Sequence, residues 1–344
     1  MPVYGISSRR LLTSLQTAVH QLGIPHPVHV HCNNLGVPGN VQTAIATMEA
    51  AQGLPMHLAH VQFYGYGAEG NRGFSSAAAQ LLEAFNRHPN ITMDVGQVLF
   101  GQTVTMSGDI IAQFSRRGDA SPHKWVMWHA EDEGSGGIVP YQYKKASFVN
   151  GLQWAIGLEI FLLSGDPWRL FFTTDHPNGA PFTRYPDLLH LLMDYDFRMA
   201  CLAELDPEIM ELTLLKDLKQ EFSLYDIAIM TRAAPAKLLG LNDRGHLQPG
   251  ALADIAVYHE QDDKAAMFRK AQWVFKNGQL IIERGEFVKR QFGQTMTVKP
   301  HFDRQIETTV KDYFDRFYSM KLSNYGVQDD LLFDQPERFS AINL

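Results

Sequence analysis

The pattern of hydrophobic and polar positions alternates between helix-like and strand-like segments over the first half of the chain. A helical repeat of apolar residues comes first, between the capping pair Ser7-Ser8 and Gly23. Short apolar runs then predict strands, at 28–32, 56–62, 91–95 and 169–174. Longer segments with helical periodicity separate them, at 38–52, 75–87 and 146–163. This order predicts an α/β fold with parallel strands that are buried on both faces.

The second half of the chain predicts helices first and short strands afterwards. Helices are expected at 188–204, 207–220 and 224–233. Strand-like runs follow at 253–258 and 272–275, and Asn277-Gly278 predicts a tight hairpin turn into a strand at 279–282. A charged helix is expected at 302–318. We therefore divide the chain into 1–250, 251–297 and 298–344.

A helix precedes the first strand, and about four parallel strands are predicted, whereas a closed (β/α) barrel has eight. We therefore expect a partial (β/α) TIM-type barrel, its second half, followed by a few strands of a small β-sandwich. This interpretation treats the chain as truncated at its N-terminal side. Half a barrel would leave two sheet edges unpaired, which favours assembly with a missing half.

The composition narrows the class of protein. The 344 residues carry a net charge of −7, and the basic residues are scattered, which argues against a nucleic-acid surface and favours a small-molecule substrate. No signal peptide or membrane-spanning run is evident, and with only two cysteines, Cys32 and Cys201, there is no disulfide framework to propose. We expect a cytoplasmic protein that binds neither a membrane nor nucleic acid.

Three of the predicted strands end in residues that can bind a metal ion: His31, His60 and Asp175. In a (β/α) barrel the carboxyl ends of the strands meet on one face, so these three side chains are expected to converge. Histidine nitrogen and carboxylate oxygen are zinc ligands. An unpaired carboxylate is costly to bury, which favours a metal or a proton-transfer role for Asp175 over the alternative of a helix cap.

Neighbouring polar residues are assigned by strand alternation. His29 should point the same way as His31 but lie deeper in the barrel, whereas His57 should lie on the face opposite His60 and be structural. Four further residues could orient ligands or contact substrate: Asn33, Asn34, Gln62 and His176.

The sequence offers two alternatives to this ligand set. His129, in the run 128–132, could replace a strand-end histidine, but its place between the third and fourth strands would leave His31 and His60 without roles. A surface loop explains that run better. Lys144 or Lys145 could be a carboxylated lysine, but a solvated helix start is the simpler interpretation.

The segment from Ala234-Pro235-Ala236 through Gly245 and Pro249-Gly250 to Ala253-Asp254-Ile255 resembles the closing signature of the amidohydrolase superfamily. The match narrows with four runs: MPVYGISSR, HPVHVHCNNLGVPGN, HVQFYGYG and TTDHPNGAPF. Together they resemble the α subunit of formylmethanofuran dehydrogenase and its relative in the bacterial formyltransferase/hydrolase complex.

This resemblance implies a binuclear zinc site that hydrolyses or forms the N-formyl amide of a methanofuran-type carrier, in one-carbon metabolism. It implies the other subunits of such a complex as partners. It also places two more histidines and a carboxylated lysine upstream of Met1, so we expect this chain to be inactive alone. Two alternatives remain: a non-catalytic scaffold subunit or orphan fragment, and a cyclic amidohydrolase like dihydroorotase or hydantoinase, which the HCNNLGVPGN run disfavours.

Overall fold

A computed structural model describes residues 5–107, 118–121, 137–298, 300–325 and 339–342 of the chain. Its first element is helix α1 (Ser8–Gln21), close to the predicted bounds. The helix begins there because the Ser7 hydroxyl accepts a hydrogen bond from the Arg10 amide at 3.1 Å, which satisfies one of the free donors of the first turn.

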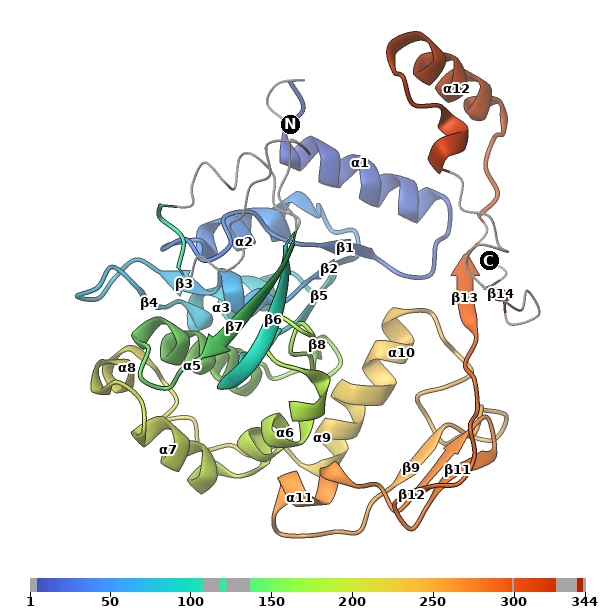
Figure 1. The fold of residues 1–344 in the computed structure, drawn as a ribbon. Coiled ribbons are helices and arrows are strands. Elements are labelled where there is room, and N and C mark those ends of the chain that lie inside the picture. Colours follow the sequence, from blue (N-terminus) through green and yellow to red (C-terminus); the bar gives the residue numbers. More distant parts are fainter. Residues whose placement is uncertain (1–4, 108–117, 122–136, 299, 326–338, 343–344) are drawn as a thin grey trace.

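The predicted parallel sheet is present, with shorter strands than expected (Figure 1). Its strands lie side by side in the order β1-β2-β5-β8: β1 (Val28–Val30), β2 (Met56–Leu58), β5 (Ile91–Asp94) and β8 (Leu170–Phe171). The helices between them also match the prediction: α2 (Val41–Ala50), α3 (Ala78–Arg87) and α5 (Phe148–Leu163). Helix α3 starts slightly later than expected, and its N-cap residue is Ala77 rather than a serine.

The two faces of this sheet differ in character. Residues in register on one face are buried with the helices in the main hydrophobic core: Val30, Leu58, Met93 and Leu170. The opposite face carries polar side chains, among them His29, His57 and Asp94, which line a cavity of about 770 Å³. Among the described residues the sheet stays open and closes into no barrel. The half-barrel interpretation therefore stays a prediction, as do the three domain boundaries.

The connection after β5 contains structure that the sequence pattern did not predict. Strands β6 (Gly101–Ser107) and β7 (Gly137–Tyr143) pair antiparallel, where only a long connection was expected. A second small hairpin pairs β3 (Tyr66–Gly67) with β4 (Ser75–Ser76), after the short helical turn η2 (Val61–Tyr64). The run around His129 lies outside the described residues.

The helical region is broken more often than predicted. The segment expected as one helix divides into α6 (Tyr185–Met193) and α7 (Tyr195–Ala203), because Asp194 accepts a hydrogen bond from the Phe197 amide at 2.7 Å and so starts a new helix. The remaining elements are shorter pieces: the turn η3 (Phe182–Arg184), α8 (Pro207–Leu212), α9 (Leu224–Ala228), the π-helical turn η4 (Ile229–Ala233) and α10 (Ala234–Leu238).

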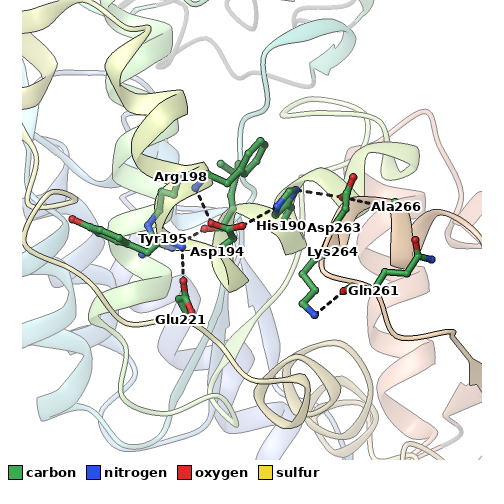
Figure 2. A network of polar contacts seen from close by, with 11 residues as sticks. His190, Asp194, Tyr195, Arg198, Glu221, Gln261, Asp263, Lys264 and Ala266 are labelled. Carbon is green, nitrogen blue, oxygen red and sulfur yellow. Dashed lines mark hydrogen bonds and ion pairs between the residues drawn. The ribbon is translucent and has the colours of Figure 1, made fainter.

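A polar network ties these helices to the connection between the first two strands of the second sheet (Figure 2). The ring of His190 on α6 lies between two carboxylates, 3.2 Å from Asp194 and 3.7 Å from Asp263. Asp263 in turn caps α11 (Lys264–Arg269) by accepting a hydrogen bond from the Ala266 amide at 2.9 Å. The α6–α7 junction and α11 are thereby held together through one histidine.

The second sheet is antiparallel, in the order β12-β11-β10-β9. It consists of β9 (Ile255–Val257), β10 (Trp273–Lys276), β11 (Gln279–Glu283) and β12 (Glu286–Phe287). The predicted hairpin turn is confirmed, because Asn277 (φ 50°) and Gly278 (φ 75°) both adopt the left-handed conformation that such a turn needs.

The C-terminal segment extends away from both sheets (Figure 1). It contains β13 (Thr295–Val298), α12 (Gln305–Phe317), η5 (Leu322–Tyr325) and β14 (Phe339–Ile342), and β13 pairs with β14. Helix α12 has no buried residue. Within the described ranges, no helix combines the length and the apolar character that crossing a bilayer requires.

Candidate functional site

The chain turns abruptly after three strands of the parallel sheet, at residues that the sequence singled out. His60 (φ 35°), Asp175 (φ 49°) and Asn34 (φ 64°) all have left-handed backbones, although none of them is glycine. This conformation is uncommon outside glycine, and strained residues cluster at functional sites. The strained turns lie beyond Val30, Leu58 and Phe171, where β1, β2 and β8 end.

The structure brings the two predicted histidine ligands into direct contact. Nδ1 of His31 lies 2.6 Å from Nε2 of His60, and the ring centroids are 4.5 Å apart. Burial lowers the pKa of the His60 imidazole. Burial, and after it the neighbouring His60, lowers the pKa of His31. Both rings therefore favour the neutral form, which is the form that binds a metal ion.

Asp175 approaches the same place from β8, across Gly96. A Cβ atom placed on Gly96 would lie 2.4 Å from Cβ of His60 and 3.4 Å from Cβ of Asp175, so the two residues meet on either side of this glycine. The Asp175 carboxylate also acts on His31, whose pKa it works to raise. The backbone amide of Asn178 donates to the Asp175 carbonyl at 2.6 Å, so Asp175 opens a tight turn, and the Asn178 side chain donates to the Asp175 carboxylate at 3.0 Å.

The donor set of two imidazoles and a carboxylate suits zinc. As they lie, however, no three histidine, cysteine, aspartate or glutamate side chains in the described ranges are arranged to hold a metal ion. Two nitrogen ligands of one tetrahedral zinc are roughly 3.3 Å apart, given bonds of about 2.0–2.1 Å, so the rings of His31 and His60 would have to separate by roughly 0.7 Å. Nδ1 of His60 is buried and has no hydrogen-bond partner in the structure. The chemistry of these residues fits zinc, and a small opening would be needed.

The prediction that His57 lies on the face opposite His60 is wrong, and its structural role stays a prediction. His57 is the register partner of His29, and its Nε2 lies 3.1 Å from the carboxylate of Asp94, on the polar face of the sheet. Strand alternation over three residues put it opposite His60, but β2 ends at Leu58 and His60 is left-handed, so the alternation does not continue that far. The ring of His29 lies 5.2 Å from that of His31, on the same side of the sheet as predicted, and its depth in a barrel stays a prediction.

Asp94 is the residue that sequence reasoning missed. It ends the apolar strand β5 and its side chain lies among those of the neighbouring strands, accepting hydrogen bonds from both His57 and the His60 amide. The signal was present in the sequence, since a carboxylate at the end of a buried strand was the argument applied to Asp175.

The two asparagines after β1 have separate partners. The side chain of Asn34 donates to the hydroxyl of Thr43 at 2.9 Å and so anchors the strained turn to α2. The side chain of Asn33 is exposed and reaches the Ser8 hydroxyl of α1 at 3.5 Å. A role for either in orienting substrate stays a prediction.

Gln62 and His176 occupy contrasting environments. Gln62 is completely buried, and its carbonyl oxygen accepts a hydrogen bond from the Val98 amide at 3.1 Å, so it supports the backbone after β5, and a role in orienting ligands stays a prediction. His176 is exposed, and its Nδ1 accepts from the Phe182 amide at 3.2 Å. Of the two, His176 is the one that solvent can reach.

Two other residues can be set aside as ligands. Cys32, next to His31 in the chain, is buried, and burial raises the pKa of its thiol to about 12, which keeps it protonated. Lys145 is exposed and pairs with Glu204 at 2.5 Å, in line with the predicted solvated helix start.

Comparison with known proteins bears on the origin of this arrangement. A model described as the amidohydrolase family matches residues 5–282. The FhcA component of the formyltransferase/hydrolase complex from Methylorubrum extorquens is 47% identical over 334 residues, covering 96% of this chain and 61% of that protein. Protein FwdA of Methanocaldococcus jannaschii is 36% identical over 353 residues, covering 96% of this chain and 62% of that protein.

A solved structure shares the fold as well. The crystal structure of the FhcABCD complex of Methylorubrum extorquens with methylofuran contains a chain that superposes with a TM-score of 0.90 at 46% sequence identity. The match covers 100% of this chain and 63% of that one. The chain thus spans about three fifths of the length of these relatives.

Proposed function

The chain belongs to the amidohydrolase family, and from that premise we propose that it acts as the hydrolase subunit of a formyltransferase/hydrolase-type complex. The reaction proposed is cleavage, or in reverse formation, of the C–N bond of an N-formyl group on a methanofuran-type carrier. Its support is the similarity to FhcA and the structural match to a complex that was crystallised with methylofuran.

The observation that carries the proposal is the meeting of His31, His60 and Asp175 at the ends of parallel strands. The two imidazoles touch at 2.6 Å, and Cβ of Asp175 lies across Gly96 from Cβ of His60. Residues 31, 60 and 175 are far apart in sequence, so a fold that assembles them at one edge of the sheet, with strained backbones at two of them, favours a functional reason.

His31 and His60 would hold zinc through their neutral rings, with Asp175 as the third donor. When bound, zinc supplies Lewis-acid polarisation of a carbonyl and lowers the pKa of water. These three donors suffice for one ion with an open position. The second zinc that the family resemblance implies would need donors beyond these three, among them the carboxylated lysine.

Within this chain Asp175 is the proposed proton carrier. Its carboxylate would accept the proton of the attacking water and return it to the departing amine nitrogen. The side-chain amide of Asn178 donates to the Asp175 carboxylate at 3.0 Å, which fixes the orientation of the carboxylate for this transfer. His176 would contact the substrate, and its exposure at the same turn supports this role.

The parallel sheet suits the second half of a (β/α) barrel, with its polar face turned to the barrel interior. The exposed C-terminal segment suits assembly with other subunits. Side chains of α12 and the residues after it are at least half exposed although they are apolar or aromatic: Ile306, Tyr313, Phe317, Tyr318 and Tyr325. Such clusters on a surface mark protein interaction sites. We propose that the other subunits of the complex are the partners.

A non-catalytic subunit is the second candidate. It is favoured by the fact that, among the described residues, no three donors are arranged for a metal ion as they lie. The two candidates differ in what zinc does: it supports turnover in the first and has no productive site in the second.

Hydrolysis of an N-formyl amine by the protein, produced with zinc and with its partner subunits, tests the proposal. Release of formate is measured for the wild type, for Asp175→Asn and for Asp262→Asn, a matched change at an exposed carboxylate. We expect formate from the wild type and the control, and a loss of about 10²-fold or more in kcat for Asp175→Asn. Equal rates for all three proteins, or no formate from any, would contradict the proposal.

A further inference from the structure

One buried carboxylate connects three strands of the parallel sheet directly beneath the candidate site. Asp94, at the end of β5, accepts hydrogen bonds from two residues of the β2 segment: Nε2 of His57 at 3.1 Å and the backbone amide of His60 at 3.0 Å. From the β8 segment it accepts the hydroxyl of Thr173 at 2.5 Å. Neither His57 nor Thr173 has a role in the proposed reaction.

The acceptor is a carboxylate anion. Asp94 is 8% exposed, and burial works to raise the pKa of its carboxyl, but hydrogen bonds from His57 and Thr173 outweigh this effect and hold the pKa below its ordinary value. Hydrogen bonds to an ionised acceptor are about twice as strong as neutral ones. A buried anion with donors from two other strands therefore ties those strands to each other.

The hydrogen bonds to Asp94 hold the backbone next to both His60 and Asp175. The bond from the His60 amide holds the residue whose backbone is left-handed (φ 35°). The bond from Thr173 holds the end of β8, two residues before Asp175. Thr173 also accepts the amide of Gly96 at 2.9 Å, and Gly96 is the residue across which His60 and Asp175 meet. Asp94 therefore fixes the backbone on both sides of the gap between the two ligands.

We propose that Asp94 is a positioning residue, which sets the separation of His60 and Asp175 through the His60 amide and Thr173 without contacting the substrate. The inference rests on the proposed function for what the site does. The geometry of the contacts does not depend on it.

The chain offers a matched control for a merely structural carboxylate. Glu159 on α5 is 1% exposed and accepts hydrogen bonds from the hydroxyls of Ser76 and Thr213 and from the Leu214 amide. It lies on the helix-covered side of the sheet and touches no candidate ligand. Replacing either carboxylate by its amide keeps the shape and replaces one acceptor by a donor.

The experiment compares Asp94→Asn with Glu159→Gln in the zinc-loaded protein with its partner subunits. Zinc affinity is measured by titration against a competing chelator, and kcat and KM by formate release. We expect Asp94→Asn to weaken zinc binding and to lower kcat, each by about 10- to 100-fold, the range for residues that orient metal ligands. The KM of Asp94→Asn should stay nearly unchanged. Glu159→Gln should alter neither the zinc affinity nor kcat by more than about twofold.

A second pair keeps the test decisive if Asp94→Asn folds poorly. Thr173→Ser retains the hydroxyl that bonds to Asp94, whereas Thr173→Val removes it at equal size. Serine should preserve zinc affinity and kcat, and valine should lower both. The inference is overturned if Asp94→Asn or Thr173→Val binds zinc as tightly as Glu159→Gln does. If the wild type binds zinc but releases no formate, the proposed function fails, and the zinc affinities alone decide the role of Asp94.

Discussion

Gly96, the glycine between His60 and Asp175, gives a quantitative prediction for the substitution Gly96→Ala. Gly96 has a backbone φ of +69°, and an added Cβ would lie 2.4 Å from Cβ and 2.8 Å from Cα of His60. It would also lie 3.4 Å from Cβ of Asp175. The first two distances are too short for carbon atoms, and one of them is to backbone, so either His60 or Gly96 must shift.

Two costs add at this position. A left-handed backbone costs an L-residue about 1–2 kcal/mol relative to glycine. Overpacking a well-filled site costs about 1–3 kcal/mol more. We therefore expect Gly96→Ala to lower the free energy of unfolding by about 2–5 kcal/mol. The displacement of His60 should also weaken zinc binding.

Gly53→Ala separates the two costs. Gly53 has a φ of +84° but no atom within 4 Å of an added Cβ. The control should therefore cost only the backbone part, about 1–2 kcal/mol. The gain from a stiffer unfolded chain applies to both substitutions and cancels in the comparison.

The assay is urea unfolding of the wild type and both variants, followed by circular dichroism, together with a zinc titration. The reasoning predicts that Gly96→Ala is less stable than Gly53→Ala by about 1–3 kcal/mol and binds zinc more weakly. It is refuted if the two variants are equally stable and bind zinc alike, because His60 would then not lie against Gly96.

Three further predictions follow from the buried groups. Gly157→Ala should lower the free energy of unfolding in urea by about 1–3 kcal/mol, because the new Cβ would meet two buried glutamine amides. Gly165→Ala, with nothing near its added Cβ, should be close to neutral, and equal losses for the two variants would contradict the packing. In a Cys201→Ser background, Cys32 should resist Ellman's reagent at pH 8 until the chain unfolds, because burial raises its pKa to about 12; rapid labelling of the native protein would contradict this. Burial raises the pKa of Glu159, so above about pH 4.5 the native state holds a proton that the unfolded chain has lost. The stability of the wild type relative to Glu159→Gln should therefore fall as pH rises from about 4.5 through the raised pKa. Urea midpoints measured against pH should show this slope, and parallel curves for the two proteins would refute it.

Much of the fold could be predicted because the periodicity of apolar residues reports directly on burial. The four parallel strands and the helices between them lie near their predicted positions. The strand-end rule also located His31 and His60, which the structure brings into contact. These predictions needed only the repeat of one structural unit, which is a local property of the sequence.

The predictions that were wrong share a different cause. Each concerned residues at or just beyond the end of a helix or strand. His57 was assigned to the wrong face because alternation was extended beyond Leu58, where β2 ends. The break between α6 and α7 depends on the cap that Asp194 forms, which the apolar pattern does not register.

The hairpin of β6 and β7 and the contacts of Asp94 could not be predicted from local pattern, although the position of Asp94 at the end of an apolar strand was visible in the sequence. The hairpin pairs residues that are 30 to 42 positions apart, from Ser107 opposite Gly137 to Gly101 opposite Tyr143. The contacts of Asp94 bring together residues of three strands. Both are tertiary arrangements, and no short window of the sequence contains the two partners.

The most direct test of the central claim is the zinc content of the purified chain, measured by elemental analysis after dialysis against a weak chelator. We predict that the wild type retains zinc, that His31→Ala and His60→Ala lose it, and that His246→Ala retains it, since that exposed ring bonds to backbone groups of its own loop. Zinc retained equally by all four proteins, or by none, would contradict the assignment of His31, His60 and Asp175 as a metal site.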